Sequence, residues 1–179
     1  MNFDHLVSGN VGIVHLVFSL LALIFGSSVL ISKKGTAVHK KMGYLYAVSM
    51  FILLVTAFML YNLFGKFGIF HWAAVISSLT LIAGIIPMII KKPKSYITMH
   101  FNSMYWSVFG LYGAFMAETL VRIPDVIIDG RGIPNELFYN LVGVAVFITM
   151  GTGYFIMWRK KKTWSNFDPT HMSTWPPHN

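Results

Sequence analysis

The stretch Val11–Lys34, VGIVHLVFSLLALIFGSSVLISKK, decides the fold of this chain. It contains an apolar run long enough to cross the hydrocarbon core of a bilayer, which takes about 20 apolar residues. The run opens with a Gly-Ile-Val-His quartet that ends at His15, and it is followed by a double lysine. A second stretch, Gly68–Lys92, also opens with Gly-Ile-x-His and ends in a double lysine. This repetition predicts two copies of one membrane-spanning unit.

The composition of the whole chain agrees with a membrane protein. Its 179 residues are 55% hydrophobic and only 11% charged, whereas a soluble domain carries about 25% charged residues. The chain therefore has too little polar surface to cover a water-soluble core. It has no cysteine, which excludes disulfides and thiolate metal sites.

Five apolar runs are long enough to span a bilayer, and we predict a helix for each. They are Val11–Ile31, Met42–Phe64, Ile69–Ile90, Phe101–Val121 and Leu137–Trp158. The predicted fold class is therefore all-α, a polytopic membrane protein with five transmembrane helices. We expect one transmembrane domain over residues 1–162 and a cytoplasmic tail over residues 163–179.

The loops between the runs alternate in charge. Eleven of the fourteen basic residues fall on one side: Lys33, Lys34, Lys40, Lys41, Lys91, Lys92, Lys94, Arg159, Lys160, Lys161 and Lys162. Only Lys66, Arg122 and Arg131 fall on the other side. Cytoplasmic loops are rich in Lys and Arg, so this asymmetry predicts the N-terminus outside and the C-terminus inside. The basic residues are thus topology signals, and nucleic-acid binding is not expected.

The internal repeat predicts the arrangement of the helices. Residues 10–64 and 66–121 form two hairpins in the same orientation, and the helix at 137–158 lies outside the duplication. Parallel repeats are related by an axis along the membrane normal. We therefore expect a four-helix bundle of two tandem hairpins, with the fifth helix packed alongside.

Four histidines fall into two pairs in this arrangement. His15 and His71 lie near the outer face, on the first and third helices. His39 and His100 lie near the inner face, at the starts of the second and fourth helices. Diagonal partners in an up-down-up-down bundle can meet across its axis. Ionisable side chains inside a membrane are expensive, so these pairs are the candidate functional residues.

One interpretation is that each pair supplies the axial ligands of a b-type haem, giving two haems and a transmembrane electron carrier. Lys40, Lys41 and Arg122 would pair with the haem propionates, and Tyr44 and Tyr105 stand five residues after the inner histidines. The diagonal arrangement is similar to that of the b561-type di-haem transmembrane cytochromes. Electrons would then pass to a redox partner or a quinone.

A second interpretation is a bare metal ion. His15, His71 and Glu118 would form an outer two-histidine, one-carboxylate site for Zn, Fe or Cu. His39 and His100 alone would make an incomplete inner site, with Tyr44 or Tyr105 as weak extra ligands. A third interpretation needs no cofactor. His15 and His71 would hydrogen-bond neighbouring helices, and His39 and His100 would reach lipid phosphates at the interface. The protein would then be a structural or assembly subunit of the lipid bilayer, as a homo-oligomer or as the anchor of a larger complex.

Two segments carry a resemblance to a known family. The segment Lys34–Tyr46, KGTAVHKKMGYLY, followed by Met50, resembles the HRxxGRxY-like motif of the DUF2306 membrane proteins. The later segment His100–Ser107, HFNSMYWS, continuing to Glu118 and Arg122, looks like the second histidine motif of that family. The resemblance covers roughly residues 10 to 123. It implies a small multi-pass protein of the bacterial inner membrane, and it implies no reaction.

Overall fold

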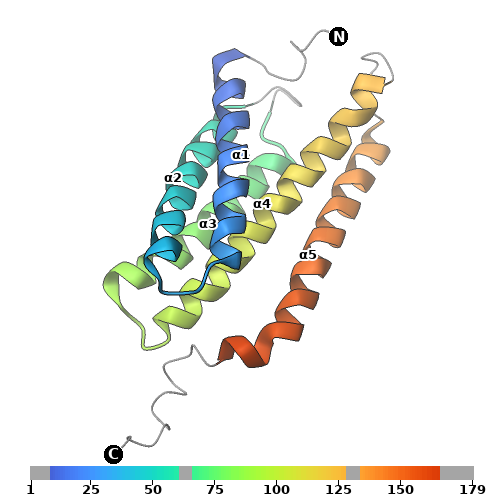
Figure 1. Ribbon diagram of the computed structural model, residues 1–179. Coiled ribbons are helices and arrows are strands. Elements are labelled where there is room, and N and C mark those ends of the chain that lie inside the picture. The colour runs from blue at the N-terminus through green and yellow to red at the C-terminus, as the bar shows by residue number, and fades with distance from the viewer. Residues whose placement is uncertain (1–8, 61–65, 128–133, 166–179) are drawn as a thin grey trace, which may run out of the picture.

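The computed structural model describes residues 9–60, 66–127 and 134–165, and all regular structure in these residues is α-helical. The helices are α1 (Gly9–Ile31), α2 (Ala37–Met59), α3 (Ile69–Ile90), α4 (Tyr96–Ile127) and α5 (Asn135–Ser165) (Figure 1). The predicted all-α class is confirmed.

Three helices differ from the apolar runs that predicted them, and α5 extends past both ends of Leu137–Trp158, from Asn135 to Ser165. Helix α2 begins at Ala37, five residues before the predicted Met42, because the Thr36 hydroxyl caps it by accepting a hydrogen bond from the His39 backbone N–H at 3.3 Å. Helix α4 extends past both ends of Phe101–Val121, to 32 residues. Apolar runs locate the part of a helix inside the membrane, whereas capping residues decide where the helix itself begins.

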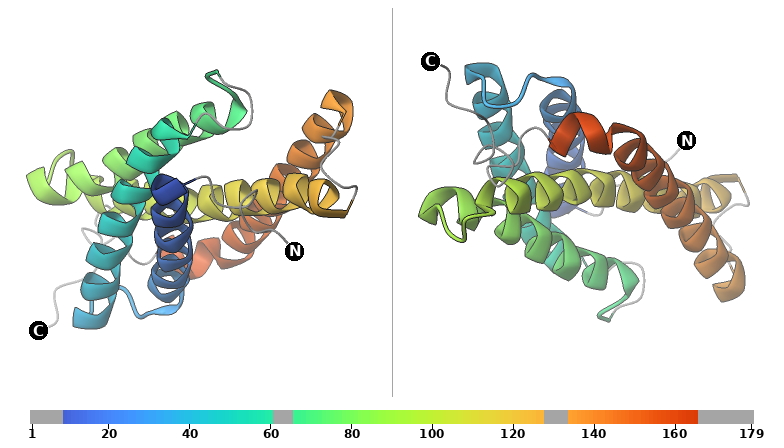
Figure 2. Two further views of the ribbon diagram at one scale, coloured as in Figure 1. Left: turned by 90° about the horizontal axis from the view of Figure 1, so that it is seen from above. Right: turned by 90° about the horizontal axis from the view of Figure 1, so that it is seen from below.

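The helices pack as two antiparallel hairpins, α1 with α2 and α3 with α4, and α5 lies against α4. Viewed along the bundle, α4 is the central helix, with α3 on one side and α1 and α2 on the other (Figure 2). Helices α1, α3 and α5 therefore cover α4, and α2 reaches it through the side chain of Tyr46.

Among the described residues, four helices are long and apolar enough to cross a membrane: α1, α2, α3 and residues 135–160 of α5. The expectation of five such spans is not met by α4. This helix carries polar residues such as His100, Glu118 and Arg122 along its length. Its central position explains the composition, because a helix enclosed by other helices presents less surface to lipid and can bury polar contacts.

The two hairpins pack together through α2 with α3 and α1 with α4, and one buried hydrogen bond also joins α2 to α4. Tyr46 is fully buried, and its hydroxyl lies 2.9 Å from the Ser107 Oγ. Tyr46 and Ser107 each follow a histidine, His39 and His100, by seven residues, about two helical turns. Equivalent positions of the repeat thus meet in the core.

Two glycines allow the helices inside each hairpin to approach closely. A Cβ on Gly26 of α1 would lie 3.0 Å from the Tyr46 ring, and a Cβ on Gly84 of α3 would lie 2.5 Å from the Met104 Sδ. Both glycines face the layer of the core beside Tyr46 and Ser107. Small residues at such points let the backbones of membrane helices pack together.

Candidate functional site

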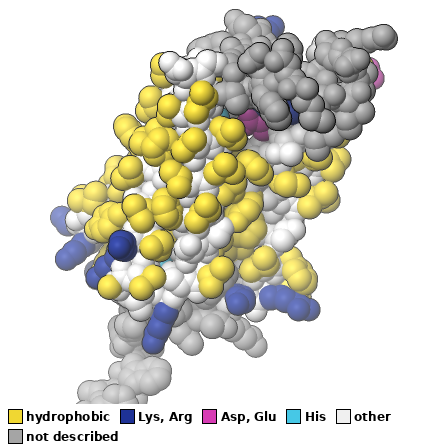
Figure 3. All heavy atoms as spheres, turned by 45° about the horizontal axis from the view of Figure 1, so that its top comes forward, with side chains coloured by type: hydrophobic (Ala, Val, Ile, Leu, Met, Phe, Trp, Pro, Cys, Tyr) yellow, Lys and Arg dark blue, Asp and Glu magenta, His cyan; other side chains and the backbone are white. Residues whose placement is uncertain are grey.

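Polar side chains gather at the two ends of the bundle, with an apolar band between them. Lys and Arg side chains gather at the end where α1 joins α2 and α3 joins α4, which we call the basic end (Figure 3). Acidic side chains appear at the opposite end in the same view. Large apolar side chains stay exposed along the band, including Phe147 at 80%. Such a surface matches the lipid-facing belt of a membrane protein.

The basic end holds the inner histidine pair. The His39 Nδ1 lies 3.2 Å from the Ser32 Oγ at the end of α1. The His100 Nδ1 lies 2.7 Å from the Gly84 carbonyl oxygen of α3, and since a carbonyl only accepts, this nitrogen carries a proton. The two rings are close enough for their charges to interact. Each histidine is thus oriented by a hydrogen bond within its own hairpin, His39 to the residue after α1 and His100 to α3.

Lys34 is a third basic group at this end, and its role goes beyond a topology signal. Its Nζ donates to the carbonyl oxygens of Val29 and Leu30 at 2.8 and 3.1 Å, which satisfies acceptors left over at the end of α1. Burial lowers the pKa of its ammonium group from the ordinary lysine value. The charge of Lys34 also acts on His39. A lysine just after a helix end is the sequence signal that could have predicted this contact.

The opposite end holds a different set of contacts. The His15 Nδ1 lies 3.0 Å from the Thr56 Oγ1 on α2. On α4, the Arg122 Nη2 lies 2.6 Å from the Glu118 Oε1, and both charges act on His15. Three helices therefore contribute to one polar cluster, in which Thr56 was not predicted from the sequence.

His71 is held separately, in the first turn of α3. It is 5% exposed, and its Nδ1 accepts a hydrogen bond from the Gly68 backbone N–H at 3.1 Å. Within residues 9–60, 66–127 and 134–165, no three His, Asp or Glu side chains are gathered in a group that could hold a metal ion. The predicted set of His15, His71 and Glu118 is therefore not assembled in this structure.

The other predicted site residues divide between surface and packing roles. Lys40 and Lys41 are exposed in the first turns of α2. Tyr44 is 75% exposed. Its counterpart Tyr105 is 3% exposed and donates its hydroxyl to the Gly153 carbonyl of α5 at 2.6 Å. Tyr105 therefore links α4 to α5.

A comparison with known protein families identifies the family of this chain. The family model described as predicted membrane protein (DUF2306) matches residues 12–158, most of the chain. The chain belongs to the DUF2306 family. The match includes nearly all of the apolar part of α5, so the expectation that the resemblance ends near residue 123 is wrong. No curated protein and no solved structure matches the chain.

This DUF2306 protein has contacts that its motifs alone do not reveal. The hydroxyl of Tyr46 pairs with Ser107, and Tyr112 pairs with Ser27 of α1. Both bonds join α4 to the first hairpin. Ser and Tyr hydroxyls within apolar runs are common, and only the three-dimensional packing shows which of them meet. The repeat did carry a signal for the first bond, because Tyr46 and Ser107 occupy equivalent positions after the two inner histidines.

Proposed function

We propose that this protein crosses the membrane five times and carries electrons through a b-type haem held at its basic end by His39 and His100. The crossing of α4 is supported by the path of the chain. Helix α4 starts at the end of the bundle where α3 finishes, and it ends where α5 starts (Figure 1). Because α3 and α5 run in the same direction, α4 must return the chain to the other face. The positive-inside rule then places the basic end in the cytoplasm.

The observation that carries the haem proposal is the bond from His100 Nδ1 to the Gly84 carbonyl. In a neutral imidazole one nitrogen carries the proton and the other has a free lone pair. With its proton on Nδ1, His100 offers Nε2 to a metal. Histidine ligands in proteins almost always donate their other ring N–H in this way, which fixes the tautomer and the orientation of the ring.

His39 has the matching arrangement. Its Nδ1 is paired with the Ser32 hydroxyl, a group that can accept the Nδ1 proton. Nε2 of His39 is then also a lone-pair donor. Two imidazoles with Nε2 lone pairs at the same end of the bundle would be the donor set of a b-type haem, whose iron would supply one-electron chemistry. Lys40 and Lys41, exposed on the first turns of α2, would pair with the propionates at the membrane surface.

The contacts at the opposite end support one haem in place of the two suggested by the repeat. The Gly68 N–H donates to Nδ1 of His71, so a neutral His71 ring carries its proton on Nε2. This is the wrong tautomer for an Nε2 ligand. A second haem between His15 and His71 would require the Gly68–His71 bond to break.

An absorption spectrum of the purified protein, expressed with ample haem and recorded before and after dithionite reduction, tests the proposal. We expect a low-spin b-type spectrum with about one haem per chain. His39→Ala and His100→Ala should each abolish that spectrum, while His71→Ala, the matched control at the other end, should retain it. Size-exclusion elution identifies any variant that fails to fold.

Three outcomes would overturn parts of this reasoning. A featureless spectrum would refute the haem and favour a structural or assembly subunit. Two haems per chain, with one lost in His71→Ala, would refute the assignment to a single pair. Stoichiometric zinc, iron or copper without haem would replace the electron carrier with a metal-binding protein.

A further inference from the structure

The basic end carries positive charge that no acidic residue of the described helices balances. Eight basic side chains are exposed there: Lys33, Lys40, Lys41, Lys91, Lys92, Lys94, Arg159 and Lys160. No Asp or Glu occurs in residues 27–45, 86–105 or 155–165, which make up this end of α1 to α5. The three acidic residues of the described helices lie in the second half of α4 and the first turn of α5, towards the opposite end (Figure 3).

The orientation of the chain in the membrane explains the basic residues but not the missing acids. Lys and Arg set the orientation, whereas Asp and Glu contribute little to it. Acidic residues among these lysines would therefore keep the topology and lower the positive potential at the surface. A surface of one sign attracts partners of the opposite sign and speeds their association. The charge pattern thus favours an interaction with an acidic partner.

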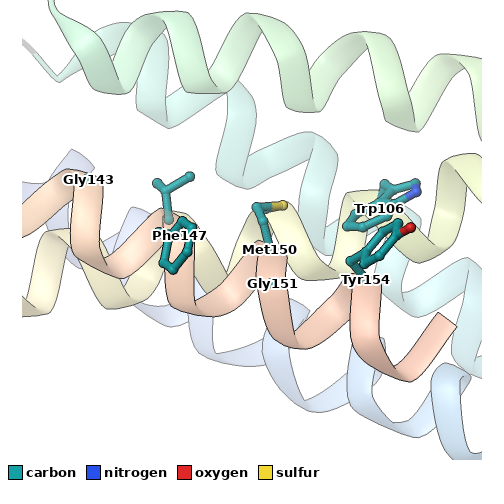
Figure 4. A pocket seen from close by; sticks show the side chains of 7 residues that line it. Trp106, Gly143, Phe147, Met150, Gly151 and Tyr154 are labelled. Atoms are coloured by element: carbon teal, nitrogen blue, oxygen red, sulfur yellow. The ribbon is translucent and has the colours of Figure 1, made fainter. Parts of the chain in front are cut away.

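The hollow between α4 and α5 contrasts with the basic end. It is lined by apolar and aromatic residues such as Trp106, Phe147 and Met150 (Figure 4). None of the seven residues that line it is charged. It lies along the part of α5 that is apolar enough to cross a membrane. The attraction for an acidic soluble protein is therefore exerted at the basic end.

The charged surface lies next to the inner histidines. The connections from α1 to α2 and from α3 to α4, residues 32–36 and 91–95, have five residues each. Connections this short carry no further element that would hold a partner away from the bundle. His39 is two residues from the start of α2, and His100 is four residues from the start of α4, which is about 3 and 6 Å along the helix axes. A protein docked on this surface would therefore come close to a haem held by the two histidines.

An electron carrier needs a partner that gives or takes single electrons. On the basis of the haem proposed above, we propose that the basic end docks a soluble cytoplasmic one-electron carrier with an acidic surface. In each encounter one electron is exchanged, so that the haem iron is reduced as the carrier is oxidised, or the reverse. Electron-transfer partners form small and transient interfaces. An open surface of spread charge suits such an encounter, because complementary charges raise the rate of association.

Binding of an acidic [2Fe–2S] ferredoxin to the full-length protein in phosphatidylcholine nanodiscs, measured by biolayer interferometry, tests the docking surface. Cytochrome c, a basic carrier, is the control probe, and empty nanodiscs are the blank. We expect the ferredoxin to bind and cytochrome c not to bind. The affinity for the ferredoxin should fall at least tenfold between about 10 and about 100 mM salt, where the Debye length shortens from about 30 to about 10 Å. This measurement requires no haem.

A variant with Lys33→Gln, Lys92→Gln and Lys94→Gln removes three exposed charges from the two connections. None of the three is assigned to a propionate, and the other eight basic residues of that side remain to set the topology. Each exposed pair contributes little, so the three changes together should weaken ferredoxin binding about tenfold. Lys66→Gln removes an exposed charge on the opposite side and should leave the affinity within about twofold.

Electron transfer separates the docking surface from the haem. In protein that contains haem, reduced ferredoxin should reduce the haem in a stopped-flow experiment, more slowly at high salt and in the triple variant. Salt-sensitive binding without a haem spectrum would refute the haem and retain an acidic partner. Binding that ignores both salt and the three lysines would overturn the docking surface. Loss of binding in nanodiscs that contain phosphatidylglycerol would also overturn it, because lipid headgroups would then occupy the lysines.

Discussion

The hydrogen bond between Tyr46 and Ser107 offers the sharpest test of how the two hairpins are joined. Both side chains are buried, at 0% and 1% exposure, and their oxygens lie 2.9 Å apart. Tyr46→Phe keeps the ring and removes only the hydroxyl, which leaves the Ser107 hydroxyl in the core without this bond. A lost hydrogen bond costs about 1 kcal/mol in water-soluble proteins. Between membrane helices the coupling averages about 0.6 kcal/mol, since the alternative state also finds partners.

We therefore expect Tyr46→Phe and Ser107→Ala each to lower the free energy of unfolding by about 1 kcal/mol. The double variant should lose less than the sum of the two, by a coupling energy of about 0.6 kcal/mol. Reversible unfolding in mixed micelles, followed by circular dichroism, measures all three.

The control is Tyr44→Phe, which removes the same hydroxyl from a side chain that is 75% exposed on the same helix. This change should stay within about 0.5 kcal/mol of the unmodified protein. Additive effects in the double variant would show that Tyr46 and Ser107 do not bond to each other, and the packing of α2 against α4 described above would then be wrong at that point.

Two further predictions concern the neighbouring contacts. Gly84→Ala places a Cβ 2.5 Å from the Met104 Sδ and 3.4 Å from the Met104 backbone nitrogen. It should therefore destabilise the fold by about 1–3 kcal/mol in the same assay. The control is Gly143→Ala, whose Cβ meets nothing within 4 Å and should not destabilise the fold. Burial lowers the pKa of Lys34 below its ordinary value near 10.5, so in the alkaline range below that value the unfolded chain binds more protons and the free energy of unfolding rises with pH. A pH series should show that this rise is lost in Lys34→Met and kept in the exposed-site control Lys33→Met; a rise that survives in Lys34→Met would assign it to another group.

Much of the fold was readable from the sequence because a bilayer constrains it strongly. Apolar runs of sufficient length must be helical, since backbone groups cannot be left unbonded in lipid. This reasoning located α1 and α3 to within two residues at each end. It failed at the start of α2, where Thr36 extends the helix outward through polar residues. It also predicted α4 as an apolar span, whereas α4 carries polar residues along its length. A helix that is largely covered by other helices faces less lipid and can carry such residues.

The arrangement of the histidines could be predicted only in part, because the repeat does not determine how the two hairpins pack together. The repeat predicts that equivalent residues face one another, but it does not say which helices of the two hairpins lie nearest the shared axis. In the structure the hydrogen bond between Tyr46 and Ser107 joins α2 to α4, and the charge of His100 acts on His39 at the basic end. The His15 Nδ1, by contrast, lies within hydrogen-bond distance of the Thr56 Oγ1 in its own hairpin. Two histidine pairs that look alike in the sequence are therefore inequivalent in space, although each pair takes one histidine from each copy of the repeat. The repeat fixes which residues are equivalent, and the packing of the hairpins decides which polar groups each histidine contacts.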